Sequence, residues 1–124
     1  MSEKQTGQEI PPMNNEQEII EGRAVAAAEK FGFELPDLDS PAFTKLTSAC
    51  IDYAKKVDYQ NQSPLAKTDE RVRTKSDEAR RRVHNDLCIK LLGTEHPKSA
   101  PEDRRRVSNF AVAVAGMDHY IDTF

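Results

Sequence analysis

Apolar residues recur at spacings of three and four along this sequence, and that spacing most limits what the chain can fold into. The clearest series is Phe43, Leu46, Cys50, Tyr53 and Val57. Such alternation places side chains on one face of an α-helix. No run of alternating apolar and polar residues of a length typical of β-strands accompanies it. The sequence therefore predicts an all-α fold.

Local signals predict where the first two helices begin and end. A helix over 15–31 carries a stripe of mostly small apolar residues and ends at Gly32, the residue type that most readily adopts a left-handed conformation. A second helix starts at Ser40-Pro41, a capping residue followed by proline at the first helical position. We expect a connector over 33–39 and a loop over 60–63.

Two further helices are predicted in the second half of the chain. The third begins at residue 63 or 68 and ends before Gly93, and a second capping pattern leaves a break near 74–77 open. The fourth follows Ser99-Ala100-Pro101-Glu102, which matches a capping box, and its apolar stripe continues to the last residue. In this interpretation Gly116 lies inside the fourth helix.

Four helices of these lengths use nearly all of the 124 residues. We therefore predict one domain over 14–124, an up-and-down four-helix bundle, with a three-helix bundle as the alternative. Residues 1–13 are polar and aperiodic, and we expect them to form a flexible tail. The apolar ends of helices three and four offer a surface through which the chain could form a homodimer.

Charge, hydropathy and cysteine content indicate the surroundings in which the protein acts. Residues 1–40 carry a net charge of −6 and residues 66–106 a net charge of +4, which suggests that the two parts face each other or that the basic part meets an anionic partner. No stretch approaches the ~20 apolar residues that span a bilayer, so no membrane segment is expected. Cys50 and Cys88 fall on apolar helix faces and fit reduced thiols in the cytoplasm.

A near-repeat carries most of the candidate site residues. RRRVHN occupies residues 80–85 and RRRVSN residues 104–109, each after an acidic pair. Either these arginines form ion pairs with glutamates of the first helix, or they bind an anion, a nucleic acid or a protein partner. The candidate binding residues are Arg80, Arg81, Arg82, Arg104, Arg105 and Arg106. With Val83 facing inward, two of the first three arginines should be exposed.

The polar residues that close the two strings form a candidate cluster of His84, Asn85 and Asn109. We expect both asparagines to be surface or capping-type residues, with a hydrogen bond between equivalent helices as the alternative. His84 and Cys88 lie four apart and could supply half of a metal site, but no paired-cysteine or His-Glu-x-x-His motif accompanies them. We predict no metal site, no cofactor and no catalytic residue. Nothing in the sequence argues for an enzyme.

Residues 77–93, DEARRRVHNDLCIKLLG, resemble the most characteristic helix of a small bacterial all-helical domain family of unknown function. In that helix an acidic start, an arginine pair and a His-Asn pair precede an aliphatic end. The resemblance covers about one seventh of the chain. It implies a compact helical bundle and supplies no catalytic residues.

These observations together favour a non-catalytic helical module that acts through protein–protein interaction or accessory regulation. Its partner would be another protein or a second copy of the chain. The alternative function is anion or nucleic-acid binding through the two arginine strings, and it requires the six arginines to form one exposed face.

Overall fold

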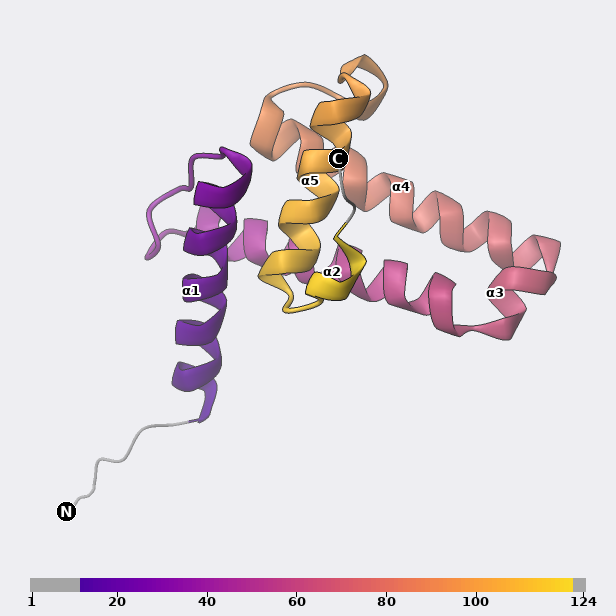
Figure 1. The fold of residues 1–124 in the computed structure, drawn as a ribbon, viewed down its shortest axis with the longest axis horizontal. Coiled ribbons are helices and arrows are strands. Elements are labelled where there is room, and N and C mark those ends of the chain that lie inside the picture. The colour runs from indigo at the N-terminus through magenta and orange to yellow at the C-terminus, as the bar shows by residue number, and fades with distance from the viewer. Residues whose placement is uncertain (1–11, 122–124) are drawn as a thin grey trace.

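The computed structural model describes the backbone of residues 12–121 and the side chains of residues 16–121. Within that range the fold is all-α, as the spacing predicts, and four main helices pack against each other (Figure 1). The main helices are α1 (Pro12–Phe31), α2 (Pro41–Gln62), α4 (Glu70–Leu92) and α5 (Pro101–Val114). The short ones are α3 (Pro64–Thr68), η1 (His96–Lys98) and η2 (Asp118–Tyr120). The tail expected over 1–13 lies outside the described residues as far as residue 11, and α1 begins before the predicted start at residue 15.

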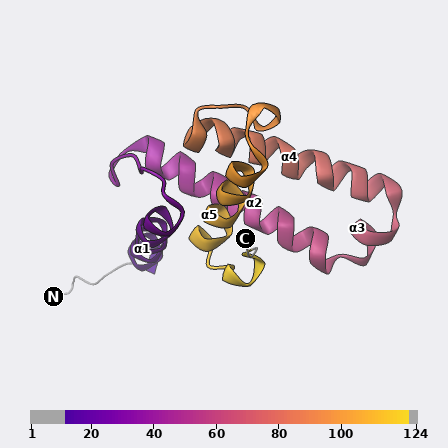
Figure 2. The same cartoon turned by 45° about the horizontal axis from the view of Figure 1, so that its top comes forward.

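Helices α2 and α4 form a long hairpin that α3 closes at one end (Figure 2). Helix α5 lies across this hairpin and packs on both of its helices. Helix α1 packs on α5, on the other side from most of the hairpin. The bundle therefore consists of a hairpin crossed by α5, with α1 packed on α5 and α5 at the centre.

Side-chain caps set the ends of the hairpin helices. Ser40 Oγ accepts a hydrogen bond from the Phe43 N–H at 3.2 Å and starts α2. Ser63 ends α2, and its Oγ accepts from the Ala66 N–H at 3.3 Å to start α3. Asp69 does the same for α4, accepting from the Val72 N–H at 3.1 Å. Each cap satisfies an N–H that has no partner inside its helix.

One predicted boundary in this hairpin is wrong, and two that the sequence left open are decided. The loop expected over 60–63 is helical as far as Gln62, because the turn needs only Ser63, whose backbone is extended before Pro64. The third predicted helix is divided at Asp69, and residues 74–77 continue α4 without a break. In that stretch the Ser76 hydroxyl donates to the Arg73 carbonyl of its own helix instead of capping a new one.

The last helix also differs from its prediction at both ends. Ser99 does not cap α5, because its hydroxyl donates to the Glu95 carbonyl at 2.9 Å, and the N-cap position is Ala100. At the other end α5 stops at Val114, and Gly116 follows with a φ of 77°. As far as residue 121 the apolar stripe belongs to a turn and to the residues around η2, so the three-four spacing there does not indicate a continuous helix; the last part of the predicted stripe, over 122–124, lies outside the described residues.

The core forms where α5 meets α1, α2 and α4. The predicted stripe of α2 is buried from Phe43 to Tyr53, and the small-residue stripe of α1 is buried from Ala24 to Phe31. The largest fully buried apolar side chains are Phe43, Phe110, Leu87, Val107, Val112 and Val114. None of the described helices is long and apolar enough to cross a membrane.

Candidate functional site: the arginine strings and the hairpin groove

The first arginine string is divided between the surface and the hairpin. Arg81 and Arg82 are exposed and Arg80 is half-buried, which confirms the predicted division around Val83. The Arg80 Nε–H donates to Gln60 Oε1 at 2.7 Å, and its Nη2 lies 3.7 Å from Asp77 Oδ1. Arg80 therefore joins α4 to α2.

The second string is used mainly inside the molecule. Arg104 Nη1 donates to the carbonyl oxygens of His96 and Ser99, at 3.1 and 3.0 Å. Arg106 Nη1 donates to the Phe31 carbonyl at the C-terminal end of α1, and its guanidinium lies over the Phe33 ring at 4.6 Å. Arg105 is exposed. The six arginines therefore do not form one exposed face.

The predicted ion pairs between these arginines and the glutamates of α1 are wrong. Among the described residues, the ion pairs join side chains three or four apart in the same helix. Arg106 does reach α1, but its partner is a backbone carbonyl. The negative end of the helix macrodipole and the unpaired carbonyls of a last turn attract a cation without any carboxylate.

His84 occupies a buried position between three elements. It is 6% exposed, and its Nε2–H donates to the Arg104 carbonyl at 3.0 Å, which fixes the tautomer. The ring lies 5.1 Å from the Tyr53 ring and 4.7 Å from the His96 ring. Burial lowers the pKa of His84 to about 4. Burial, with the nearby arginine charges, also lowers the pKa of His96.

The structure brings two members of the candidate cluster of His84, Asn85 and Asn109 together. His84 and Asn85 both meet His96, since Asn85 Oδ1 accepts from the His96 N–H at 2.8 Å. Asn109 is 1% exposed, so its expected surface position is wrong. It lies on the part of α5 that other helices surround on several sides, a placement that its own sequence neighbours do not reveal.

His84 and Cys88, considered above as half of a metal site, gain no third possible ligand among the described residues. Burial raises the pKa of the Cys88 thiol, which also hydrogen-bonds to Ser99. Burial raises the pKa of the Cys50 thiol as well, and both cysteines are free and buried. In the part of the chain that the structure describes, no group of three or more His, Cys, Asp or Glu side chains could hold a metal ion.

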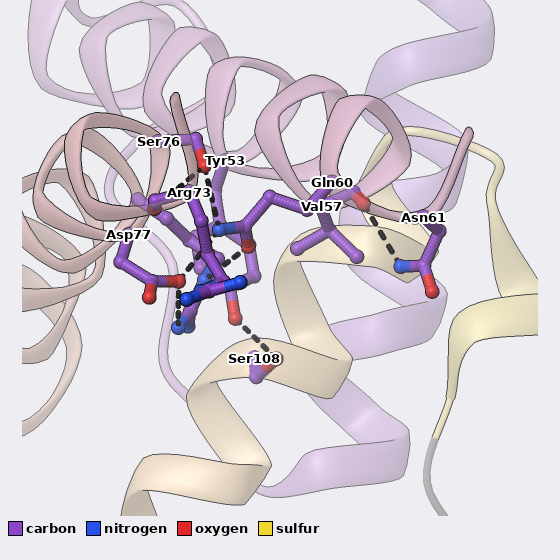
Figure 3. Close-up of polar contacts among 9 residues, drawn as sticks. Tyr53, Val57, Gln60, Asn61, Arg73, Ser76, Asp77 and Ser108 are labelled. Carbon is purple, nitrogen blue, oxygen red and sulfur yellow. Dashed lines mark hydrogen bonds and ion pairs between the residues drawn. The ribbon is translucent and has the colours of Figure 1, made fainter. Parts of the chain in front are cut away.

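Polar residues that the sequence did not single out connect α2 to α4 and α5 (Figure 3). Gln60 Nε2 donates to Asp77 Oδ1 at 2.6 Å and to Ser76 Oγ at 3.1 Å. The hydrogen bond from Gln60 lowers the pKa of Asp77. The hydroxyls of Tyr53 and Ser108 lie 2.8 Å apart. Gln60 was assigned to a loop and Tyr53 to an apolar stripe, so no local signal indicated these contacts.

A groove of about 490 Å³ lies on the hairpin between α2 and the first half of α4. Its apolar part consists of Tyr59, Val72 and Ala79. Tyr59 is 46% exposed, a high value for a large aromatic side chain beside other apolar surface. The α4 stripe is weakest in this half of the helix, so the facing side chains leave the space between the helices unfilled.

Lysines surround this apolar surface. Lys55 and Lys56 line the groove from α2, and Lys75 lines it from α4. Lys56 pairs with Asp52 at 2.8 Å, whereas Lys55 and Lys75 make no ion pair with any described residue. The groove therefore combines an apolar floor with two cations that have no internal counter-charge.

Comparison with models of protein families, with curated proteins and with solved structures finds no match for this chain. The resemblance of residues 77–93 to a small bacterial helical family stays a prediction.

Proposed function

We propose that this protein is a non-catalytic interaction module that binds an acidic, amphipathic segment of a partner protein in the groove between α2 and α4. The observation that carries the proposal is the pair of unpaired lysines, Lys55 and Lys75, beside the exposed apolar surface of Tyr59 and Val72. Its setting, as the sequence suggests, is the cytoplasm, where the buried thiols of Cys50 and Cys88 stay reduced.

The chemistry of the groove defines the partner. An amphipathic helix places apolar side chains on one face at spacings of three and four, and such a face suits an apolar groove between two helices. Carboxylates that flank this face would meet Lys55 and Lys75. Complementary charge of this kind accelerates encounter and rejects basic segments.

The arginine strings support nucleic-acid binding less well. Arg80, Arg104 and Arg106 each hydrogen-bond inside the molecule. The exposed arginines lie on two crossing helices, Arg81 and Arg82 on α4 and Arg105 on α5. Nucleic-acid binding by phosphate contacts needs a row of free cations along the backbone. The proposal therefore places the binding surface on the lysines of the hairpin.

The test uses a labelled helical peptide with leucines on one face and glutamates beside them, with fluorescence anisotropy as the readout. We expect saturable binding, and we expect Lys55→Glu combined with Lys75→Glu to weaken it roughly tenfold or more, because like charges then face each other. Lys45→Glu combined with Lys98→Glu is the matched control, since it makes the same charge change at residues that do not line the groove.

Three results would contradict the proposal. One is equal binding of a peptide in which lysines replace the glutamates. Another is binding that the Lys55/Lys75 variant leaves unchanged. The third is tighter binding of labelled RNA or DNA that is lost on changing Arg81, Arg82 and Arg105 to Gln. Sedimentation of the chain alone separates the remaining alternative, a homodimer, from binding of another protein.

A further inference from the structure

A second cavity, of about 400 Å³, lies between α2, α5 and the turn that contains η2. It shares no lining residue with the groove on the hairpin. Residues of both repeated strings reach it, Arg80 from the first and Ser108 from the second. The rest of its polar lining comes from Tyr53, Gln60, Asn61, His119 and Tyr120.

Two hydroxyls at this cavity have a hydrogen-bond donor to spare. The Tyr53 and Ser108 oxygens share one hydrogen bond of 2.8 Å, which uses one of their two hydroxyl hydrogens (Figure 3). Neither hydroxyl has a second hydrogen-bond partner among the described residues. Tyr53 is only 3% exposed, so its hydroxyl is best satisfied by donating to Ser108, and the half-buried Ser108 hydroxyl then keeps the spare hydrogen. The arrangement therefore has room for an acceptor from outside the chain.

Arg80 supplies a positioned cation at the same cavity. Gln60 accepts from its Nε–H, and Gln60 is itself held by Asp77. These contacts orient the guanidinium, while Arg80 Nη1 has no partner among the described residues. A guanidinium held in place by neighbours is well suited to bind an oxyanion, since little conformational freedom is lost on binding.

The residues that line the cavity carry a positive charge. Arg80 is the one Lys, Arg, Asp or Glu side chain among the described residues that line it. Two carboxylates lie beside the lining, since Asp77 Oδ1 is 3.7 Å from Arg80 Nη2 and Asp58 accepts from the Tyr120 hydroxyl at 2.7 Å. Val57, Val112 and Ile121 form the apolar remainder of the lining.

We infer that this cavity is a binding site for a small oxyanion, a carboxylate or a phosphate, held by the Arg80 guanidinium and by the Tyr53–Ser108 hydroxyl pair. The site is independent of the peptide groove. It gives the repeated strings a shared role at one place, beside the structural contacts that three of their six arginines make.

The test is an NMR titration of the isotope-labelled protein with inorganic phosphate and, separately, with acetate, at constant ionic strength adjusted with chloride. We expect saturable shifts at Arg80, Ser108 and Tyr53 with at least one of the two anions. The anion that saturates the site shows whether it takes a carboxylate or a phosphate. Saturation with neither anion, or shifts that centre on the exposed lysines, would overturn the inference.

Variants make the assignment specific. Ser108→Ala removes one hydroxyl and leaves the Gln60–Asp77–Arg80 contacts in place, and we expect it to weaken anion binding roughly tenfold. Arg80→Gln should weaken it on the order of 100-fold, and Arg81→Gln, which alters an exposed neighbour, should leave it unchanged. Equal affinity in Ser108→Ala and the unaltered chain would overturn the inference, even where Arg80→Gln fails to fold. The Lys55/Lys75 variant should bind the anion normally, which keeps this test separate from that of the groove.

Discussion

Burial of His84 makes its protonation part of the stability of the fold. The ring donates to the Arg104 carbonyl and packs between Tyr53 and His96, where a positive charge would be poorly solvated. Its pKa is about 4 in the folded state, against an ordinary value of about 6.5 for an unfolded chain. Between these values the unfolded state binds the proton more readily. The stability that the neutral His84 ring contributes is therefore fully present above pH 6.5 and is lost as the pH falls toward 4.

We predict that His84→Gln flattens this pH dependence. In the unaltered protein the His84 contribution to the free energy of unfolding should fall by about 3 kcal/mol between pH 7 and pH 4. The variant keeps a donor for the Arg104 carbonyl but does not titrate, so the pH dependence that remains comes from other groups with lowered pKa values, such as His96 and Asp77. Urea unfolding at several pH values measures both slopes. The control is His119→Gln, which changes an exposed histidine. If the free energy of unfolding of His84→Gln and of the control depended on pH in the same way, the prediction would be contradicted.

For the arginines, the sequence predicts which side chains are exposed but not which residues they bind. The division of Arg80, Arg81 and Arg82 around Val83 follows from helical geometry alone. The partners did not follow, because Gln60 and the Phe31 carbonyl lie 20 and 75 positions from the arginines they bind. Only the packing of helices brings such residues together.

At the scale of the element, Gly116 shows how one residue ends a helix that the apolar pattern would continue. Its φ of 77° is costly for any residue with a Cβ. A Cβ at this position would also lie 2.6 Å from Arg23 Cζ, so α1 approaches the α5 terminus closely here. The spacing of three and four past Val114 is compatible with a turn whose side chains also reach the core.

We predict that Gly116→Ala destabilises the protein by about 1–2 kcal/mol through the left-handed backbone, with a further loss from displacing Arg23. Gly93→Ala is the matched control, because its φ is 72° and nothing lies within 4 Å of the added Cβ. Thermal or urea unfolding gives both values. In an Arg23→Ala background the two glycine substitutions should cost about the same. A cost for Gly116→Ala no greater than that for Gly93→Ala in the unaltered background would show that Arg23 moves away freely.

At the scale of the whole molecule, α1 depends on α5 for its attachment. It packs mainly on α5, and Arg106 joins the two at the C-terminal end of α1. The same guanidinium bonds to Asp103 at 3.0 Å and covers the Phe33 ring. One side chain thus links the last turn of α1, the following connector and the start of α5.

We predict that Arg106→Gln loosens α1 while leaving the α2–α4 hairpin closed. Loss of a charged hydrogen bond to a helix end should cost about 1–3 kcal/mol. Hydrogen exchange should therefore accelerate in α1 and hardly change in α2 and α4. Arg82→Gln, at an exposed arginine of the first string, is the control. Uniform acceleration in all helices would mean instead that α1 and the hairpin unfold as one unit.

The sequence by itself determined the helices, their buried faces and several of their caps, because these depend on residues within about one helical turn of each other. Phe43 to Tyr53 and Ala24 to Phe31 are buried as their spacing requires. The tertiary structure alone decided how the hairpin crosses α5, which arginines became structural and where the groove and the polar cavity lie. These features arise from side chains far apart in the chain, such as Tyr53 and Ser108, whose meeting no local pattern encodes.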